Sequence, residues 1–343
     1  MKNRNAGLDL GRFVAALIVS FGHFLFQDPF IAKWSKDLQL LSSFKLGANA
    51  VAFFFGLSGF VLTTAFSSGT SRGDWFRSRL ARLMPVYWTC WFIPLLGWYL
   101  VSHEFPLSRF GTVLGISASQ SLIPSHALDA PNPPLWSLSV EIYLSLIFAL
   151  FVQMKRATLI LTSILLFSVV LEASTGIRLL SNSGVLNALP LFFLGHYLAR
   201  LSTLRPITKM RFKLMCIAPV LISVLFFPTR LQSISSGPWG SVANLVLIGP
   251  LLIGLSAFEF KGLSNRICTE LGKRSYSLYA CHVPVIYFSR HVFSPKFGDQ
   301  PLVYTGLVFL IVVLCTEALY RLIERPAVKW SRSIRRKHIQ SSN

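Results

Sequence analysis

The sequence predicts an all-α protein that crosses a lipid bilayer about ten times. Three observations support this prediction: long apolar segments recur along the chain, charged residues are scarce, and Lys and Arg gather between the apolar segments. Of the 343 residues, 53% are hydrophobic and 13% are charged, roughly half the charged fraction of a soluble domain. The mean hydropathy is +0.57. A soluble protein has no core large enough to bury so many apolar segments.

Ten apolar segments are each about twenty residues long, which is enough for a helix to cross ~30 Å of hydrocarbon. These segments lie near residues 8–26, 46–66, 84–102, 136–154, 157–175, 183–201, 213–228, 240–258, 275–294 and 302–323. We expect Pro326 to end the last of them, because proline interrupts a helix. An eleventh segment, 109–124, is a weaker candidate because it is rich in Gly and Ser.

The distribution of basic residues decides how the segment 109–124 is interpreted. If it does not cross and the amino terminus is cytoplasmic, 25 of the 33 Lys and Arg residues lie on the cytoplasmic side. If it crossed, every later loop would invert and this asymmetry would be lost. We therefore predict ten transmembrane helices with both termini cytoplasmic, and a re-entrant or interfacial segment at 109–124. Protein or water must satisfy the backbone of such a segment.

The chain predicts one membrane domain, residues 1–329, followed by a basic tail, 330–343. We expect the tail to be disordered and to lie near anionic lipid on the cytoplasmic side. The net charge of +20 could indicate nucleic-acid binding, but the basic residues fall between apolar segments, which favours a topological role. The five cysteines show no metal-ligand spacing, so we expect no metal. The basic start leads into a retained first span rather than a cleaved signal peptide.

Arg12 and His23 are candidate functional residues within the first predicted span. They are eleven residues apart, so a helix turns about 1,100° between them and both side chains point the same way. A rise of ~1.5 Å per residue separates them by about 16 Å, with Arg12 nearer the cytoplasm. Ionisable groups inside a span usually face a cavity or a partner. Simpler interpretations are that Arg12 anchors the helix at the membrane interface and that His23 is an interior histidine with its hydrogen bonds made within the protein.

Arg79, Arg82 and Glu141 are candidates near the ends of other spans. Arg79 and Arg82 are three residues apart and share a helical face at the cytoplasmic boundary, where two guanidinium groups suit phosphate oxygens. They could also be ordinary cytoplasmic anchors. Glu141 lies about 7 Å deeper than Trp136, which fits the outer interface. Its carboxylate could orient a histidine or accept a hydroxyl hydrogen bond, or form a structural ion pair.

A polar stripe in the ninth predicted span contains Ser275, Tyr279 and His282, spaced four and three residues apart. These side chains could contact a substrate or form hydrogen bonds between helices. The second span ends in the segment 53–60, FFFGLSGF, whose small residues allow close helix packing.

These residues together resemble integral-membrane acyltransferase family 3, from Leu8 to Pro326. The motifs that carry the resemblance are a basic residue and a histidine with ten residues between them (Arg12 and His23), FFxLSGF (54–60), RxxR (79–82), WSLSVE (136–141), SYSLYxxHxP (275–284) and ERP (324–326). Each motif is weak alone, but six in the family's order on ten spans are specific.

The resemblance implies transfer of an acyl group, usually acetyl, from cytoplasmic coenzyme A to a hydroxyl of an envelope or exported carbohydrate. Arg12 and His23 match the family's catalytic pair, and Arg79 with Arg82 match its second arginine motif. The resemblance implies acetyl-CoA as donor substrate, no tightly bound cofactor, and a bacterial inner-membrane location. We expect acyl-CoA, a carbohydrate acceptor and the lipid bilayer as partners, and no nucleic acid.

A mechanism follows as a hypothesis. Arg79 and Arg82 bind the coenzyme A phosphates, and Ser275, Tyr279 and His282 contact the donor. Arg12 positions the donor, and His23 acts as general base with Glu141 as its orienting group. A variant in which His23 carries the acyl group remains open. Two alternatives also remain: a transporter or flippase of a lipid-linked glycan, and an acyltransferase acting on a small secreted molecule.

Overall fold

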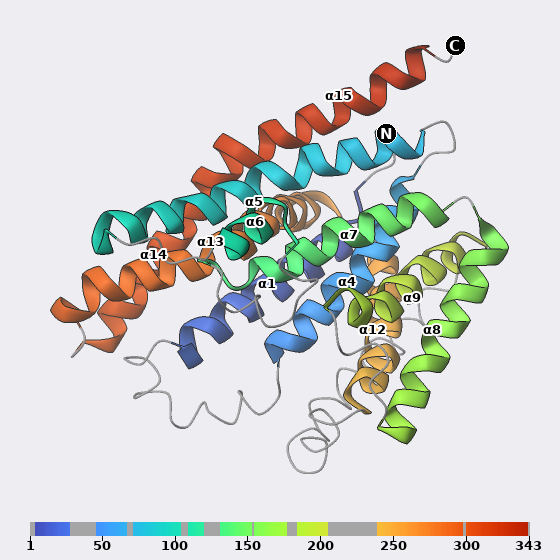
Figure 1. Cartoon of the computed structure of the whole chain (residues 1–343), viewed down its shortest axis with the longest axis horizontal. Coiled ribbons are helices and arrows are strands. Elements are labelled where there is room, and N and C mark those ends of the chain that lie inside the picture. The colour runs from blue at the N-terminus through green and yellow to red at the C-terminus, as the bar shows by residue number, and fades with distance from the viewer. Residues whose placement is uncertain are drawn as a thin grey trace.

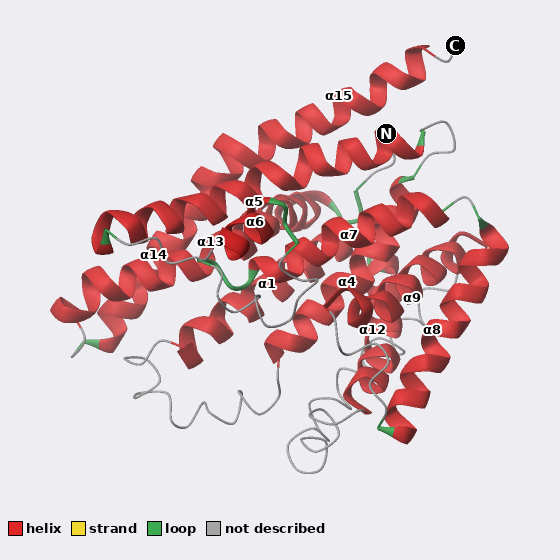
Figure 2. Cartoon of the chain, in the orientation of Figure 1, coloured by secondary structure: helices red, strands yellow, loops and turns green. Residues whose placement is uncertain are grey.

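The computed structural model describes residues 4–27, 46–66, 71–103, 109–119, 131–152, 154–176, 184–204, 239–297 and 300–341. Within these ranges every regular element is helical (Figure 2). The predicted all-α class is therefore confirmed for the part of the chain that the structure describes.

The helices follow the apolar segments of the sequence (Figure 1). They are α1 (Ala6–Gln27), α4 (Leu46–Ala65), α5 (Arg72–Ser102), α6 (Arg109–Ile116), α7 (Leu135–Phe151), α8 (Lys155–Thr175), α9 (Gly184–Leu204), α12 (Trp239–Ala257), α13 (Gly262–Phe297), α14 (Pro301–Leu319), the π-helical turn η4 (Tyr320–Glu324) and α15 (Arg325–Ser341). Each predicted span within the described ranges coincides with a helix, whereas the predicted span 213–228 lies outside them.

Four helical stretches are long and apolar enough to cross a membrane: Ala6–Leu25, Gly47–Ala65, Thr158–Thr175 and Pro301–Arg335. Together with many outward-facing Leu, Val and Phe side chains, they indicate a protein that crosses the membrane several times. The number of spans and the side on which each terminus lies stay predictions.

Residues 109–116 of the segment predicted to be re-entrant or interfacial form the short helix α6, and its residues 120–124 lie outside the described residues. Eight residues extend only about 12 Å, which is too short to cross the hydrocarbon. Side chains of neighbouring helices satisfy the last carbonyls of this segment: Tyr87 Oη donates to Gly115 O (3.0 Å), Trp88 Nε1 to Ile116 O (3.0 Å), and Ser139 Oγ to Ala118 O. A helix end surrounded by apolar side chains requires such partners.

Glycines bring α4 and α9 into backbone contact, which confirms the packing role expected for the small residues of segment 53–60. A Cβ added at Gly59 would overlap Phe192 O, and one added at Gly195 would overlap Gly56 O. The side of α4 opposite to this seam carries residues that line the cavity described below. The glycine seam therefore sets the distance of those residues from α9.

The carboxyl-terminal tail differs from the expectation of disorder. Residues 325–341 form α15, which lies along α5 (Figure 1). Ala327 and Ser331, one helical turn apart, are both buried, so α15 has a face that packs against its neighbours. Pro326 does not end the helix, because it falls in the first turn after η4, where a missing backbone N–H is tolerated.

The glycine seam makes a testable prediction. Gly195→Ala forces a methyl group into the carbonyl of Gly56, and we expect a loss of ~1–3 kcal/mol of stability from overpacking. The melting temperature of the detergent-solubilised protein measures this loss. Gly249→Ala is the matched control, because its Cβ would meet only Leu198 and Leu194 side chains, at 3.6 and 3.8 Å. Equal melting temperatures for the two variants would contradict the prediction.

Candidate functional site

The ion pair between Arg79 of α5 and Glu141 of α7 lies at one wall of the site. Arg79 Nη2 is 2.6 Å from Glu141 Oε1, and the two side chains are 9% and 25% exposed. Arg79 Nε also donates to Ser145 Oγ at 3.4 Å. Burial lowers the pKa of the Arg79 guanidinium to about 10, and the carboxylate of Glu141 opposes this shift, so Arg79 stays charged near neutral pH.

The role of Glu141 as the orienting group of His23 is not supported, and the structure instead shows the alternative, an ion pair with a neighbouring helix. The carboxylate is engaged by Arg79, so it belongs with the arginines. The depth estimated from Trp136 gave no information about which neighbouring helix α7 would face. Packing of α5 against α7 decides that Glu141 meets Arg79.

Arg12 reaches the same region from α1, where its guanidinium has only a weak partner. Arg12 Nη1 is 3.4 Å from Asp9 Oδ1, and Asp9 is already held by Arg4 at 2.6 and 2.7 Å. Gly272 of α13 lies against Asp9 with no room for a Cβ, so α1 and α13 pack closely here. Much of the charge of Arg12 is therefore available to a ligand.

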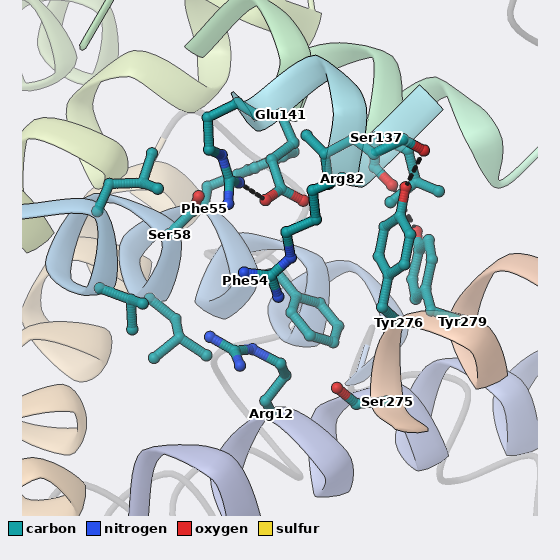
Figure 3. Close-up of a pocket in the computed structure, with 16 residues that line it drawn as sticks. Arg12, Phe54, Phe55, Ser58, Arg82, Ser137, Glu141, Ser275, Tyr276 and Tyr279 are labelled. Carbon is teal, nitrogen blue, oxygen red and sulfur yellow. Dashed lines mark hydrogen bonds and ion pairs between the residues drawn. The ribbon is translucent and has the colours of Figure 1, made fainter. Parts of the chain in front are cut away.

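Arg82 is one turn from Arg79 on α5, and no hydrogen bond or ion pair joins it to any described residue. It is half-buried. Figure 3 shows the side chains of Arg12, Arg82 and Glu141 directed toward one another. A partly buried cation without a partner among the described residues is a direct indication of an anion-binding position.

A cavity of about 80 Å³ lies among these side chains. Its lining contains three arginines and one carboxylate, the remainder being apolar or hydroxyl-bearing. The lining residues are Arg12, Phe54, Phe55, Leu57, Ser58, Val61, Leu62, Arg79, Arg82, Leu83, Ser137, Leu138, Glu141, Ser275, Tyr276 and Tyr279. The ionisable lining has an excess of two positive charges and favours an anionic ligand.

The polar stripe of α13 divides between two places. Ser275 and Tyr279 line the cavity, and Tyr279 Oη shares a hydrogen bond of 2.7 Å with Ser137 Oγ. Ser275 Oγ donates to Gly272 O at 2.9 Å. His282 does not line the cavity, so its expected contact with the donor is not supported.

His282 instead contacts His23, across the interface between α13 and α1. His282 Nε2 is 3.2 Å from His23 Nδ1, and the ring centroids are 5.0 Å apart. The ring of Tyr279 lies 5.7 Å from that of His282, so Tyr279 borders both the cavity and the histidine pair. Arg12 and His23 occupy the same helix, as predicted, with Arg12 at the cavity and His23 outside its lining.

Sequence reasoning missed several residues. Tyr276 lines the cavity and donates from Oη to Leu83 O at 3.0 Å, although its spacing from Ser275 gave no reason to place both there. Phe54 and Ser58, interpreted only as packing residues, also line it. Glu324 entered the sequence analysis only as part of the ERP motif, but it is 3% exposed and accepts a 2.6 Å hydrogen bond from Ser277 Oγ. Its signal was an acidic residue directly after an apolar span.

Comparisons with known proteins point to one family. A protein-family model described as "Acyltransferase domain" matches residues 5–321. The acyltransferase MdmB of Streptomyces mycarofaciens is 32% identical over 149 residues, 42% of this chain and 38% of that protein. The O-acetyl transferase of Shigella phage Sf6 is 26% identical over 143 residues, 39% of this chain and 41% of that protein.

The matched regions therefore span about two fifths of the length of these relatives. No solved structure matches the chain. The family model, in contrast, covers nearly the whole sequence, which confirms the resemblance seen in the motifs. The protein belongs to this acyltransferase family and is a multi-pass membrane member of it.

Proposed function

We propose that this protein is a membrane O-acyltransferase that moves an acyl group, by default acetyl, from acyl-CoA to a carbohydrate hydroxyl. The acceptor would be an envelope or exported polysaccharide, such as O-antigen, exopolysaccharide or a lipo-oligosaccharide. The protein would act in a bacterial inner membrane, with the donor on the cytoplasmic side. The observation that carries the proposal is the arginine-lined cavity within a chain of this family.

Charge supports an acyl-CoA donor at this cavity. Coenzyme A carries phosphate groups, and arginine binds phosphate oxygens through paired, charge-assisted hydrogen bonds. Arg82 has no described partner and Arg12 only a weak one, so both can bind phosphate without losing a strong ion pair. Arg79, held by Glu141, would contribute charge from a fixed position.

The lining of the cavity supports a division of the donor. Apolar and hydroxyl-bearing side chains make up most of the lining and suit the pantetheine arm. The nucleotide would remain at the mouth, with its phosphates against the arginines.

His23 supplies a base for the acceptor. It lies on the same helix as Arg12, about 16 Å farther along its axis by helical rise. In our proposal the thioester reaches His23 past the hydrogen bond between Tyr279 and Ser137. His23 then removes the proton of the acceptor hydroxyl as its oxygen attacks the thioester carbonyl carbon. Transient acylation of His23 is an alternative route to the same product.

Two alternatives to this proposal are a different acceptor and a different activity, and experiment can distinguish both from it. A small secreted molecule could replace the polysaccharide, because the donor site would be unchanged. A glycan transporter would also contain buried polar residues, but membership in an acyltransferase family favours group transfer.

The direct test uses the full chain in lipid nanodiscs with labelled acetyl-CoA and glycan extracts. We expect release of free coenzyme A together with acetylation of the glycan, and at least a hundredfold loss in His23→Ala, since general-base catalysis contributes about 10²–10⁴-fold. Mass analysis of envelope glycans with and without the gene identifies the acceptor. Full transfer by a folded His23→Ala protein contradicts the role of His23. Glycan movement without consumption of acetyl-CoA contradicts the proposed function.

Arg82 makes a prediction about donor binding. Arg82→Ala removes a charge-assisted contact to phosphate worth ~1.5–3 kcal/mol, which corresponds to about a 10- to 100-fold increase in KM for acetyl-CoA. Initial rates at varied acetyl-CoA measure it. The control is Arg77→Ala on the same helix. The Arg77 side chain is 76% exposed, and its ion pair with Asp74 is long, at 3.6 Å between Nη1 and Oδ1. The same KM in both variants would place the phosphates elsewhere.

Glu141 makes a prediction about stability. Glu141→Ala leaves the buried guanidinium of Arg79 without its partner, and the loss of one partner from a buried pair costs roughly 3–5 kcal/mol. We expect the melting temperature to fall by several degrees, and the double variant Arg79→Met/Glu141→Ala to recover part of the loss. A melting temperature unaffected by Glu141→Ala would show that the pair is not structural.

A further inference from the structure

The histidine pair contains enough contacts to assign its protons. His282 Nδ1 lies 2.7 Å from Tyr279 O, and His23 Nδ1 lies 2.9 Å from Val19 O. The remaining contact joins His282 Nε2 to His23 Nδ1 at 3.2 Å. Both carbonyl contacts are backbone acceptors within the same helix as the histidine.

A carbonyl oxygen only accepts hydrogen bonds, so each nitrogen that contacts one must carry a proton. Nδ1 is therefore protonated in His282 and in His23. In a neutral imidazole only one nitrogen carries a proton, which leaves Nε2 of each ring with a lone pair. The opposite tautomers would place two lone pairs against carbonyl oxygens at 2.7 and 2.9 Å.

This assignment gives the contact between the rings a direction. His23 Nδ1–H donates to His282 Nε2, and shares the same proton with Val19 O. The lone pair on His23 Nε2 then points away from His282. No described residue forms a hydrogen bond with this atom, and the His23 ring is half-buried, so Nε2 is available to a substrate.

His282 is held rigidly enough to act on His23. Its side chain is 1% exposed, and its ring is packed beside Tyr279. Tyr279 is itself fixed by the 2.7 Å hydrogen bond between its hydroxyl and Ser137. Two further contacts, from Phe54 to the Tyr279 ring and from Thr316 to Cys281, surround the same turn of α13.

We propose that His282 is a positioning residue that selects the His23 tautomer with a free Nε2 and stabilises the imidazolium formed during transfer. This inference rests on the proposed function. It replaces Glu141 with His282 as the group that orients the base. The arrangement follows the general logic of a base held by a hydrogen-bond acceptor on its other nitrogen.

His23 Nε2 takes the proton of the acceptor hydroxyl while the hydroxyl oxygen bonds to the thioester carbonyl carbon. The carbon–sulfur bond then breaks, and the leaving thiolate takes that proton from Nε2. Throughout, His23 Nδ1–H continues to donate to His282 Nε2. The Nδ1 proton of His282 stays on that ring and continues to donate to Tyr279 O.

The chain offers a matched control in His196 of α9. This histidine is also buried, at 2% exposure, and it contacts Thr63 Oγ1 at 2.6 Å. It packs against Phe148 and Phe193, and it contacts neither the cavity lining nor the histidine pair. Replacing it tests the effect of losing a buried histidine without touching the proposed chemistry.

The experiment measures kcat and KM for acetyl-CoA in nanodiscs for His282→Met, His282→Gln and His196→Leu. Methionine and glutamine have similar volumes, but only glutamine is a good hydrogen-bond acceptor. We expect His282→Met to lower kcat at least tenfold with KM unchanged. His282→Gln should stay within a few-fold of the original protein, and His196→Leu should keep full kcat per folded protein.

A double variant separates a positioning role from a structural one. If His282 acts through His23, adding His282→Met to His23→Ala lowers the residual rate no further. Equal kcat for His282→Met and the original protein, or a full additional loss in the double variant, overturns the inference. If the original protein transfers no acyl group, the proposed function fails first. If His23→Ala is inactive but His282→Met is active, only the present inference fails.

If His282→Met does not accumulate in membranes, the tautomers can be measured on the original protein instead. Solid-state NMR of the original protein labelled with ¹⁵N-histidine reports each tautomer. The signals that disappear in His23→Ala should be those of a protonated Nδ1 and an unprotonated Nε2. Signals of the opposite tautomer overturn the inference.

Discussion

The cost of burying charge among apolar helices is the constraint on which this arrangement depends. A guanidinium group surrounded by hydrocarbon side chains must meet a carboxylate, a polar group or a ligand. Arg79 meets Glu141, and Arg4 meets Asp9. Among the described residues Arg12 has only a weak partner in Asp9 and Arg82 has none, and both border the cavity. The cost of burying charge that favours the two ion pairs would also favour an anion beside these two arginines.

Close helix contact brings these charges together. Gly272 lets α13 approach Asp9 on α1, and Gly59 with Gly195 lets α4 approach α9. Of the helices that border the cavity, α1 and α13 are thereby held at a distance that larger side chains would not permit. α15 lies along α5, and Arg335 stacks over the ring of Trp75 at 5.5 Å. The helix that carries Arg79 and Arg82 is thus packed against α15.

Much of the candidate site could be predicted as a set of residues, but not as a set of pairs. Arg12, Arg79, Arg82, Glu141, Ser275 and Tyr279 were all selected from the sequence, and all line one cavity. The structure places Glu141 against Arg79 and His282 against His23, which supports neither the orienting role of Glu141 nor the donor contact of His282. Both residues lie in the expected helices, yet depth along a helix does not define which neighbour it faces. Tyr276 was missed because it falls outside the spacing of four and three residues that relates Ser275, Tyr279 and His282.

The sequence by itself determined the properties of individual helices, namely their positions in the chain and the residues that share a face. Apolar length defined the helices, and a turn of ~100° per residue placed Arg12 and His23 on one face of α1. Motif order identified the family before any comparison. Only the tertiary structure decided which helices meet. Glu141 follows Arg79 by 62 residues, and His282 follows His23 by 259. A local periodicity cannot predict contacts between residues so far apart in the sequence, because these contacts depend on how the helices pack. The same reason applies to α15, where a basic segment became a helix by packing against α5.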